Sequence, residues 1–395
     1  MCSAFRLKTN SESMRHIQRQ ALRDILQIQS ENCIECGLCC KECTFLQQYG
    51  TPKQIADSFD PASAQDLNMP FECSLCGLCR AICPAKIDPA AMFLEMRREA
   101  VLQGKQLWHN YSTLLSYEKR GTSKRYSYYA LPENCDTVFF PGCTLSGTRH
   151  DKVKAIYEHV RKTVPQLGIV LDCCTKPSHD LGRKRYFSSM FTEMEDFLQL
   201  HKVKNILVAC PSCYQVFQEY GAGLQVKTIY EYFAETSIPS SANIPATVTI
   251  HDPCTTRNEL QINAAIRQLI RCKSLTIHEM NSCKTKTLCC GEGGAVGSAS
   301  WGIRRKEEAG KNRIITYCAG CANLLDCIHP TSHIIDLLFD PQSALAGKTK
   351  VAKAPWTYLY RLFLKRYFKK SIDAAVSRER TFTGESCKAR RFWMR

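Results

Sequence analysis

Two cysteine runs near the N-terminus constrain this chain more than any other feature. They read Cys33-x2-Cys36-x2-Cys39-x3-Cys43 and Cys73-x2-Cys76-x2-Cys79-x3-Cys83-Pro84. In this doubled spacing, the first three thiols of each run are expected to bind one [4Fe–4S] cube, and the fourth crosses to the other cube. The expected ligand sets are Cys33, Cys36, Cys39 and Cys83 for one cluster, and Cys73, Cys76, Cys79 and Cys43 for the other.

Zinc is the alternative metal for these thiols, because soft thiolates also select zinc and copper(I). Structural zinc normally takes four ligands as two separated pairs, which differs from two tight runs of four. Gly37 and Gly77 each follow the second thiol of a run, where the backbone must pass close to a cube. The pattern predicts a helical two-cluster, ferredoxin-like domain at 31–104, preceded by an N-terminal helical segment at 1–30.

Composition limits the class of protein. The chain has 395 residues and 25 cysteines. Disulfide scaffolds are usually small secreted chains, and the polar start from Met1 to Arg19 has no apolar signal region. We therefore expect reduced, metal-bound thiols in the cytoplasm. No stretch of about 18 apolar residues predicts a membrane-spanning helix. The net charge of +16 is concentrated from Lys348 onward, with 14 Lys/Arg against 3 Asp/Glu, so it does not indicate nucleic-acid binding by the body of the protein.

A second cysteine pattern occurs twice after a polar, tyrosine-rich connector at 105–134. Each copy has an apolar run ending in a thiol, an adjacent pair of thiols, a second apolar run ending in Cys-x2-Cys, and a closing apolar segment. The thiols are Cys143, Cys173, Cys174, Cys210 and Cys213 in the first copy, and Cys254, Cys289, Cys290, Cys318 and Cys321 in the second. Because the copies keep this order at a nearly constant offset, they indicate duplication over 135–240 and 241–340.

Short runs of Val, Ile and Phe alternate with helix-length spacers in both copies, which is typical of α/β domains with parallel sheets. Chemistry in such domains lies at the carboxyl ends of strands. A helix beginning just after Cys210 or Cys318 would direct free N–H groups at a thiolate. The predicted fold is thus α+β and multidomain: a helical dicluster domain followed by a duplicated α/β cysteine-rich domain. Two alternatives stay open for a copy, a thioredoxin-like redox pair at Cys210 and Cys213 and a zinc site.

The combined motifs resemble a known family. Two ferredoxin motifs followed by two cysteine-rich repeats with a Cys-Cys-Gly (CCG) core are similar to the heterodisulfide reductase polypeptide with this same layout. They also resemble the iron–sulfur subunits of anaerobic glycerol-3-phosphate dehydrogenase and glycolate oxidase. The resemblance covers residues 30 to 340 and implies that the repeats hold non-cubane [4Fe–4S] clusters, which in the reductases bind and cleave a disulfide in one-electron steps.

The second copy matches this family pattern well. Cys254 stands in a His-Asp-Pro-Cys setting, and Cys289-Cys290-Gly291-Glu292-Gly293-Gly294 forms the glycine-rich core. The resemblance therefore implies an additional non-cubane cluster here, with Gly291 beside it. Its five cysteines, expected to be the catalytic residues, are Cys254, Cys289, Cys290, Cys318 and Cys321.

The first copy departs from the pattern at Thr175, where the core has glycine. A β-branched residue is expected to resist a positive φ and to crowd a cluster. The first copy is therefore expected to hold either a second such cluster or zinc. His179, His251 and Asp252 lie beside these sites, as proton donors or as residues that order loops and cap helices.

The C-terminal tail, 341–395, has a basic amphipathic pattern. Pro355 is expected to begin a helix with Arg361, Lys365 and Lys369 on its polar side. Its apolar side carries Trp356, Leu359, Tyr360, Phe363, Leu364, Tyr367 and Phe368. The favoured interpretation is a helix that lies on an anionic membrane or docks on a membrane subunit, and the alternative is a terminal helix that covers the protein's own core.

These features predict an iron–sulfur electron-transfer subunit of a membrane-associated oxidoreductase. Electrons would pass between a redox partner, two cubanes and the cysteine-rich sites toward a disulfide or a quinone. The alternative is a catalytic subunit that itself cleaves a disulfide at a non-cubane cluster; purely structural zinc ranks below both. No Gly-x-Gly-x-x-Gly fingerprint occurs, so the expected partners are a flavoprotein dehydrogenase, a cytochrome b-type membrane subunit, or both. The expected location is cytoplasmic, on the inner face of the cell membrane.

Overall fold

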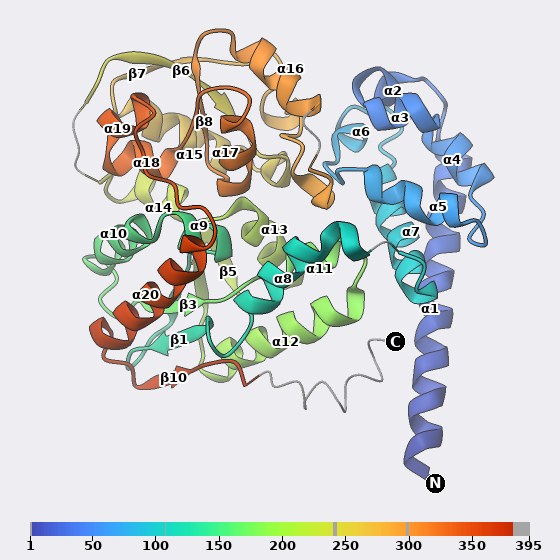
Figure 1. Ribbon diagram of the computed structural model, residues 1–395, viewed down its shortest axis with the longest axis horizontal. Helices are drawn as coiled ribbons and strands as arrows, with labels where there is room; N and C mark the ends of the chain where they lie inside the picture. Colours follow the sequence, from blue (N-terminus) through green and yellow to red (C-terminus); the bar gives the residue numbers. More distant parts are fainter. Residues whose placement is uncertain (1, 107, 240–242, 298–299, 382–395) are drawn as a thin grey trace.

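A computed structural model describes residues 2–106, 108–239, 243–297 and 300–381, with side chains described from residue 15 onward. The chain forms a helical N-terminal domain beside two α/β halves (Figure 1). The helical domain is drawn in blue, the first α/β half mainly in green and the second in orange. Within the described residues, no helix combines the length and the apolar character needed to cross a bilayer.

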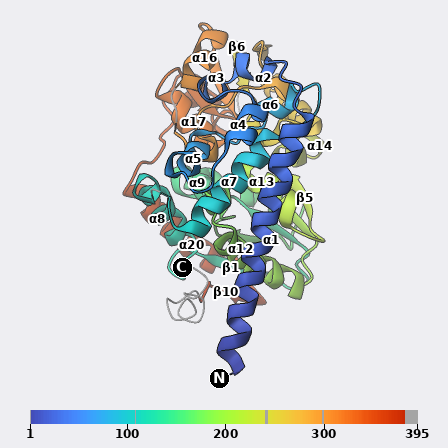
Figure 2. The ribbon, with the colours of Figure 1, turned by 90° about the vertical axis from the view of Figure 1, so that its right-hand side faces the viewer.

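The helical domain is built on two long helices, α1 (Cys2–Asn32) and α7 (Pro89–Gln103), which pack against each other (Figure 2). Asp88 caps α7 by accepting a hydrogen bond from the Ala91 N–H, and Gly104 ends the helix in the left-handed region. The shorter helices are α2 (Leu38–Glu42), α3 (Thr44–Tyr49), α4 (Pro52–Ser58), α5 (Ala64–Asn68), η1 (Met69–Glu72) and α6 (Leu78–Ala81). Phe45, Leu46 and Phe93 lie in its small core, so this domain positions the cysteine runs with little regular structure.

The first repeat contains four parallel strands in the order β3-β2-β4-β5. Val138, Phe139 and Phe140 are fully buried, as expected for a parallel strand covered on both faces. The elements are β2 (Thr137–Phe140), α9 (Cys143–Thr148), α10 (His150–Arg161), β3 (Gly168–Leu171), α11 (Lys176–Asp180), α12 (Lys184–Leu200), β4 (Asn205–Val208), α13 (Pro211–Tyr220), β5 (Gln225–Thr228) and α14 (Ile229–Glu235).

The second repeat has the corresponding strand order, β7-β6-β8-β9, and all its strands are parallel. In both repeats the chain order reverses between the two central strands, and this switch point is where open α/β sheets bind ligands. The elements are β6 (Ala246–His251), η3 (Cys254–Thr256), α15 (Leu260–Arg271), β7 (Leu275–His278), η4 (Lys284–Lys286), η5 (Gly293–Ala295), α16 (Ser300–Ala309), β8 (Arg313–Thr316), α17 (Ala319–Asp326), β9 (Thr331–His333) and α18 (Ile334–Phe339).

The two repeats share one hydrophobic core, and polar contacts also join them. The Tyr230 hydroxyl lies 2.7 Å from the carbonyl oxygen of Ala209 and 3.1 Å from that of Tyr317. These carbonyls immediately precede Cys210 and Cys318, so one side chain contacts the strand ends of both repeats.

The connector and the tail differ from expectation, because both contribute strands to the first sheet. β1 (Tyr128–Leu131) pairs antiparallel with β3, and β10 (Val376–Arg378) pairs antiparallel with β1. The first sheet is therefore mixed rather than purely parallel. The remaining connector elements are η2 (Trp108–Tyr111) and α8 (Ser112–Gly121). The predicted connector is thus a folded part of the first half, because its tyrosines are buried in the sheet.

The tail helix begins where the sequence predicts, as α20 (Trp356–Ser371) after α19 (Pro341–Leu345). The assignment of its faces was wrong, because the helix covers the first repeat with a mixed face. Leu364 and Phe368 are fully buried. Arg361 and Lys365 are also buried, and they donate to the carbonyl oxygens of Gly121 and Lys124.

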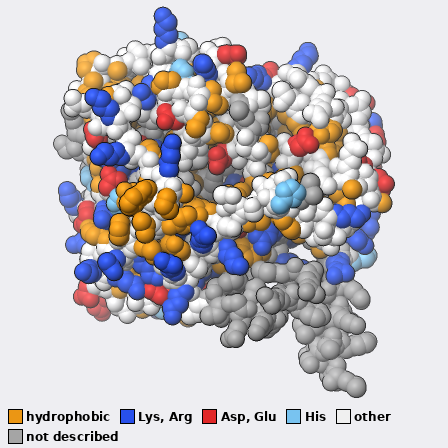
Figure 3. All heavy atoms as spheres, viewed as in Figure 1, with side chains coloured by type: hydrophobic (Ala, Val, Ile, Leu, Met, Phe, Trp, Pro, Cys, Tyr) orange, Lys and Arg blue, Asp and Glu red, His pale blue; other side chains and the backbone are white. Residues whose placement is uncertain are grey.

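An apolar strip nevertheless remains on the outer side of α20. Trp356, Leu359 and Phe363 are 56%, 38% and 47% exposed. Figure 3, drawn from the side of Figure 1, shows a cluster of hydrophobic side chains over this helix with Lys and Arg side chains around it. We call these three residues the α20 strip.

Candidate metal centres

The second cysteine run lines a cavity of about 240 Å³ together with the last cysteine of the first run. Cys73, Cys76 and Cys79 lie on the loop between η1 and α6 and at the start of α6, and Cys43 follows α2. Cys43 therefore lies with the second run rather than with its own.

The last cysteine of the second run makes the reverse crossing. Cys83 lines a pocket with Cys33, Cys36 and Cys39, which Cys79 also reaches. Cys36 is exposed, whereas the other three are half-buried. This set lies toward the outside of the helical domain.

Gly37 and Gly77 hold equivalent turns in the two runs. Each immediately precedes a short helix, and their φ angles are +70° and +69°. No protein atom would lie within 4 Å of a Cβ at either position. The left-handed backbone is therefore sufficient reason for glycine here.

Electrostatics in the second cavity favour a bound cation. Burial raises the pKa of the Cys73 thiol and of the Cys76 thiol to about 12. Thiolates at this depth would be desolvated and would repel one another, so they need positive charge between them. Iron supplies that charge and takes thiolate ligands, and the donor set fits a [4Fe–4S] cluster.

In the first repeat, five thiols converge at the carboxyl end of the sheet. The Sγ atoms of Cys173 and Cys143 are 3.8 Å apart, and those of Cys213 and Cys174 are 3.4 Å apart. A Cβ at Gly142 would lie 3.2 Å from the Cys213 Sγ and the Cys210 Cβ. Hydrogen bonds from Cys173 and Cys213 lower the pKa of Cys174 to about 6. The cluster therefore contains a readily ionised thiol, which is the ligand form.

Thr175 adopts the conformation that the sequence analysis expected it to resist. Its φ is +57°, and its hydroxyl donates to the Cys174 carbonyl oxygen at 2.8 Å. The expectation was wrong, because full burial of this side chain and the adjoining α11 hold a strained backbone.

In the second repeat, the sulfur-bearing loops close around Cys289 and Cys290, which are 0% and 2% exposed. The Gly291 N–H donates to the Cys289 Sγ at 3.2 Å, and the Cys321 N–H donates to the Cys318 Sγ at 3.4 Å. Hydrogen bonds from Cys254 and Cys290 hold the pKa of Cys289 well below its usual value. Gly291, with φ +104°, permits the turn that directs its N–H at sulfur.

The helices expected after the Cys-x2-Cys thiols are present. α13 begins at Pro211 and α17 at Ala319, directly after Cys210 and Cys318. Their first N–H groups lie beside the thiols and favour the thiolate charge. That prediction is confirmed.

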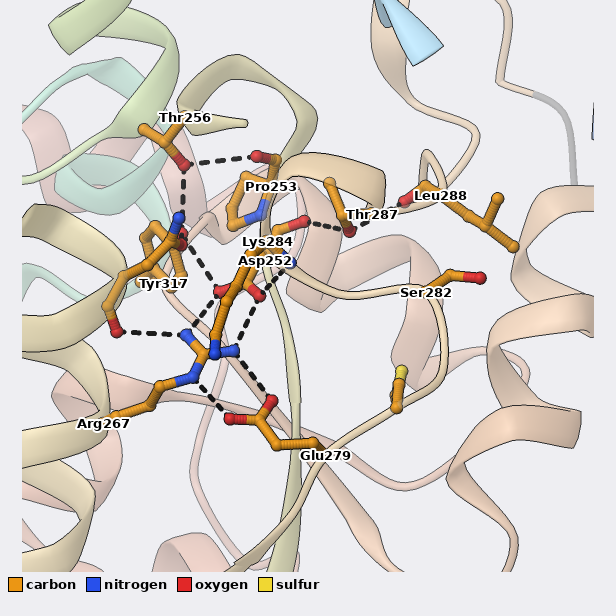
Figure 4. Close-up of polar contacts among 12 residues, drawn as sticks. Asp252, Pro253, Thr256, Arg267, Glu279, Ser282, Lys284, Thr287, Leu288 and Tyr317 are labelled. Carbon is orange, nitrogen blue, oxygen red and sulfur yellow. Dashed lines mark hydrogen bonds and ion pairs between the residues drawn. The ribbon is translucent and has the colours of Figure 1, made fainter. Parts of the chain in front are cut away.

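Asp252 orders the loop that leads to the paired cysteines (Figure 4). Its carboxylate forms a buried two-point ion pair with Arg267, at 3.0 and 2.9 Å, and accepts from the Lys284 N–H at 2.8 Å. Its carbonyl oxygen accepts from the Thr287 hydroxyl at 2.7 Å. These contacts give Asp252 the loop-ordering role of the two considered from sequence.

His179 has a comparable role in the first repeat. Its Nδ1 lies 2.9 Å from the Asp180 carboxylate, and its Nε2 lies 2.8 Å from the Tyr220 hydroxyl. Both ring nitrogens are thus engaged by neighbouring side chains, and His179 orders α11 against α13.

The second repeat packs directly on the second cysteine run. A Cβ at Gly293 would lie 2.6 Å from the Ser74 carbonyl oxygen, and one at Gly294 would lie 2.7 Å from the Cys73 carbonyl oxygen. Arg257 donates to the Cys76 carbonyl oxygen. The glycines therefore allow the paired-cysteine loop to touch the run that lines the 240 Å³ cavity.

Arg97 is a structural residue that the sequence analysis missed. It is fully buried on α7, and its guanidinium donates to the carbonyl oxygens of Pro70, Cys73, Asp180 and Gly294. It thereby joins the helical domain to both repeats. The available signal was its place on the apolar face of α7, four residues after Phe93.

Comparison with known protein families matches both parts of this architecture. Residues 32–88 match a 4Fe-4S dicluster domain, and residues 137–218 and 248–326 both match the Cysteine-rich (CCG) domain. The chain belongs to the CCG-domain iron–sulfur proteins. It binds iron–sulfur clusters and is related to oxidoreductase subunits.

Relatives of this CCG protein are distant. It is 23% identical over 329 residues to an uncharacterized iron–sulfur protein of Methanocaldococcus jannaschii, covering 73% of this chain and 66% of that one. It is 23% identical over 354 residues to another of Methanococcus maripaludis, covering 80% of this chain and 69% of that one. A third relative is the EtfAB:quinone oxidoreductase of Syntrophomonas wolfei, 21% identical over 261 residues, covering 57% of this chain and 36% of that one.

The CCG protein thus spans about two thirds of the first two relatives and about a third of the third. Among solved structures, an aspartate racemase of Picrophilus torridus aligns at 10% identity over 57% of this chain and 98% of that one, with a TM-score of 0.23. That likeness is too weak to bear on fold or activity.

Proposed function

We propose that this CCG protein is the electron-transfer subunit of a membrane-associated oxidoreductase. Two [4Fe–4S] clusters would be held by the crossed cysteine sets, and a non-cubane [4Fe–4S] cluster by the five cysteines of the second repeat. The first repeat would hold a second such cluster or zinc. When bound, these groups accept and release single electrons.

One observation carries the proposal: the second cysteine run and the paired-cysteine loop are in direct contact. Arg257, which precedes α15, links the second repeat to Cys76, and Gly293 and Gly294 pack on the carbonyls of Ser74 and Cys73. Such closeness suits electron exchange between the two sites and has no evident purpose if the metal were structural zinc.

The Cys33 set, with its exposed Cys36, would be the contact point for a redox partner. Ile34 and Leu38, on the loop and helix around Cys36, are 65% and 43% exposed. The likeness to an EtfAB:quinone oxidoreductase supports a flavoprotein donor and a quinone acceptor. A cytochrome b-type subunit is the other partner that we propose.

The α20 strip would attach the complex to the cytoplasmic face of the membrane. Three exposed apolar side chains stand among the exposed cations Lys353, Arg366 and Lys370. This combination suits an anionic lipid surface, where apolar groups enter the interface and cations meet headgroups.

A disulfide reductase is the second candidate function. The low pKa of Cys289 and the half-buried Cys254 favour it. The near-complete burial of Cys289 and Cys290 favours the relay, because a substrate sulfur must reach the metal.

Anaerobic purification followed by iron analysis and EPR tests the proposal. About eight irons per chain would indicate the two cubanes alone, and about twelve to sixteen would add clusters in the repeats. Cys290→Ser should remove the repeat-2 signal and keep both cubane signals, whereas Cys79→Ser should remove a cubane signal and keep that of the repeat. A colourless protein that contains only zinc would reject the proposed function. A repeat signal that changes on addition of thiol would favour the reductase over the relay.

A further inference from the structure

His251 has no hydrogen-bond partner in the described structure. It is the last residue of β6 and is 0% exposed, and neither Nδ1 nor Nε2 has a partner atom. Buried polar atoms are nearly always satisfied, because an unpaired one costs about 1–3 kcal/mol. A bound group is therefore expected to satisfy this ring.

The ring faces two of the second repeat's thiols. One ring nitrogen of His251 and the Sγ atoms of Cys290 and Cys321 all lie within 4.8 Å of one another. Metal–sulfur bonds of about 2.3 Å and metal–nitrogen bonds of about 2.0 Å allow a single metal atom to reach three such donors after small side-chain rotations. The three residues come from β6, the paired-cysteine loop and α17, so the fold itself assembles them.

The protonation state of the ring suits a ligand. Burial, with Arg305 adding to it, lowers the pKa of His251 to about 3. The imidazole is therefore neutral in ordinary conditions and carries a lone pair on one nitrogen.

We propose that His251 is a nitrogen ligand of the metal centre in the second repeat, acting with Cys290 and Cys321. The proposal rests on the proposed function, because it assumes a metal centre at this repeat. A neutral imidazole in place of a thiolate makes a site less negative, and in iron–sulfur centres this exchange raises the reduction potential.

The first repeat supplies an internal comparison. Phe140 stands 111 residues before His251, which is the offset between Cys143 and Cys254. Phe140 is likewise fully buried at the end of the first central strand. Phenylalanine cannot bind a metal, so the first site has only thiols at this depth. The second centre should therefore have the higher potential and collect the electrons.

Isotope labelling combined with pulsed EPR tests the assignment. Protein containing 15N-histidine and unlabelled protein would be purified anaerobically, and the repeat-2 centre would be examined in both. A directly bound imidazole should give a nitrogen coupling that changes with the label. His251→Phe, which copies the first repeat, should abolish that coupling and lower the potential of the centre. The matched control, His179→Gln, should leave both unchanged.

Each outcome separates this assignment from the proposed function. An iron signal at the second repeat without histidine coupling in the unmodified protein overturns the ligand and keeps the relay, whether or not His251→Phe folds. A coupling that persists in His251→Phe overturns it as well. If the repeat contains zinc instead, the relay fails, and X-ray absorption at the zinc edge decides the ligand: a nitrogen that His251→Phe removes supports His251, and an all-sulfur shell overturns it.

Discussion

The Nη2 atom of Arg257 lies 3.1 Å from the carbonyl oxygen of Cys76, across the junction between the second repeat and the second cysteine run. Its Nη1 also donates to the Thr285 carbonyl oxygen at 2.7 Å. Arg257→Met should cost about 3 kcal/mol of stability, because two carbonyl oxygens lose a charged donor. It should also slow electron exchange between the two sites while each keeps its EPR spectrum. Chemical denaturation and freeze-quench EPR measure the two effects.

Arg304 provides the control, because it crosses the same junction at the surface. It pairs with the Glu42 carboxylate at 2.8 Å, and the two side chains are 38% and 43% exposed. Arg304→Met should cost at most about 1 kcal/mol, since exposed ion pairs contribute little. Equal losses from the two variants would contradict the role given to Arg257.

Replacing Arg97 should be among the most damaging single changes in this protein. Arg97→Met would leave four buried carbonyl oxygens without their donor, with an expected cost of about 3–5 kcal/mol. Arg97→Lys should not restore the loss, because a lysine ammonium cannot reproduce the planar fork. Thermal unfolding measures the cost, and limited proteolysis should cut between the helical domain and the repeats. Arg80→Ala, at an exposed pair with Asp88, is the control and should change little.

Glu118 should make stability depend on pH. Its carboxylate is buried and accepts from the Ser178 N–H at 2.9 Å, and burial raises its pKa to about 7. The unfolded value is about 4.3. Between these pH values the folded state holds a proton that the unfolded state has released. Stability should therefore fall as pH rises from about 4.3 to 7, by at most about 4 kcal/mol, and the effect should level off above 7.

Glu118→Gln removes this titration and keeps the side-chain shape. The difference between the wild-type and variant unfolding free energies should change with pH over that window, as urea titrations at several pH values would show. Parallel curves for the two proteins would rule out a raised pKa at this position.

The α20 strip can be tested apart from folding. Leu359→Ser with Phe363→Ser should weaken binding to phosphatidylserine vesicles, because each buried apolar side chain contributes about 1.5–3 kcal/mol. Stability should change by less than about 0.5 kcal/mol per exposed site. Leu364→Ala, at a fully buried position, should instead cost about 2–5 kcal/mol and leave vesicle binding intact. Co-sedimentation that is equal for wild type and the double variant would argue against membrane attachment.

The sequence predicted those features that are encoded locally. The spacing of the two N-terminal runs, the duplicated thiols and the helices that begin after Cys210 and Cys318 each depend on short stretches of chain. Strand runs such as Val138 to Phe140 were recognisable because parallel strands buried on both faces are continuously apolar.

Features that depend on distant segments were not predictable. β10 pairs with β1 although the two strands lie far apart in the sequence, and no local pattern specifies such a partner or register. The tail helix was placed wrongly because Arg361 and Lys365 look like solvent-facing cations, yet they find backbone carbonyls at the end of α8 and in the loop after it. Arg97 escaped notice because its four acceptors lie on three separate parts of the chain.

The hydroxyl of Tyr230 meets the backbone just ahead of Cys210 and, equally, just ahead of Cys318. Any adjustment of one strand end as iron is inserted must therefore be felt at the other through this shared group. Assembly of the two halves should then be cooperative, so that maturing molecules are found either empty or filled in both repeats, and half-filled forms are rare. Exchanging this tyrosine for phenylalanine should let the halves mature separately.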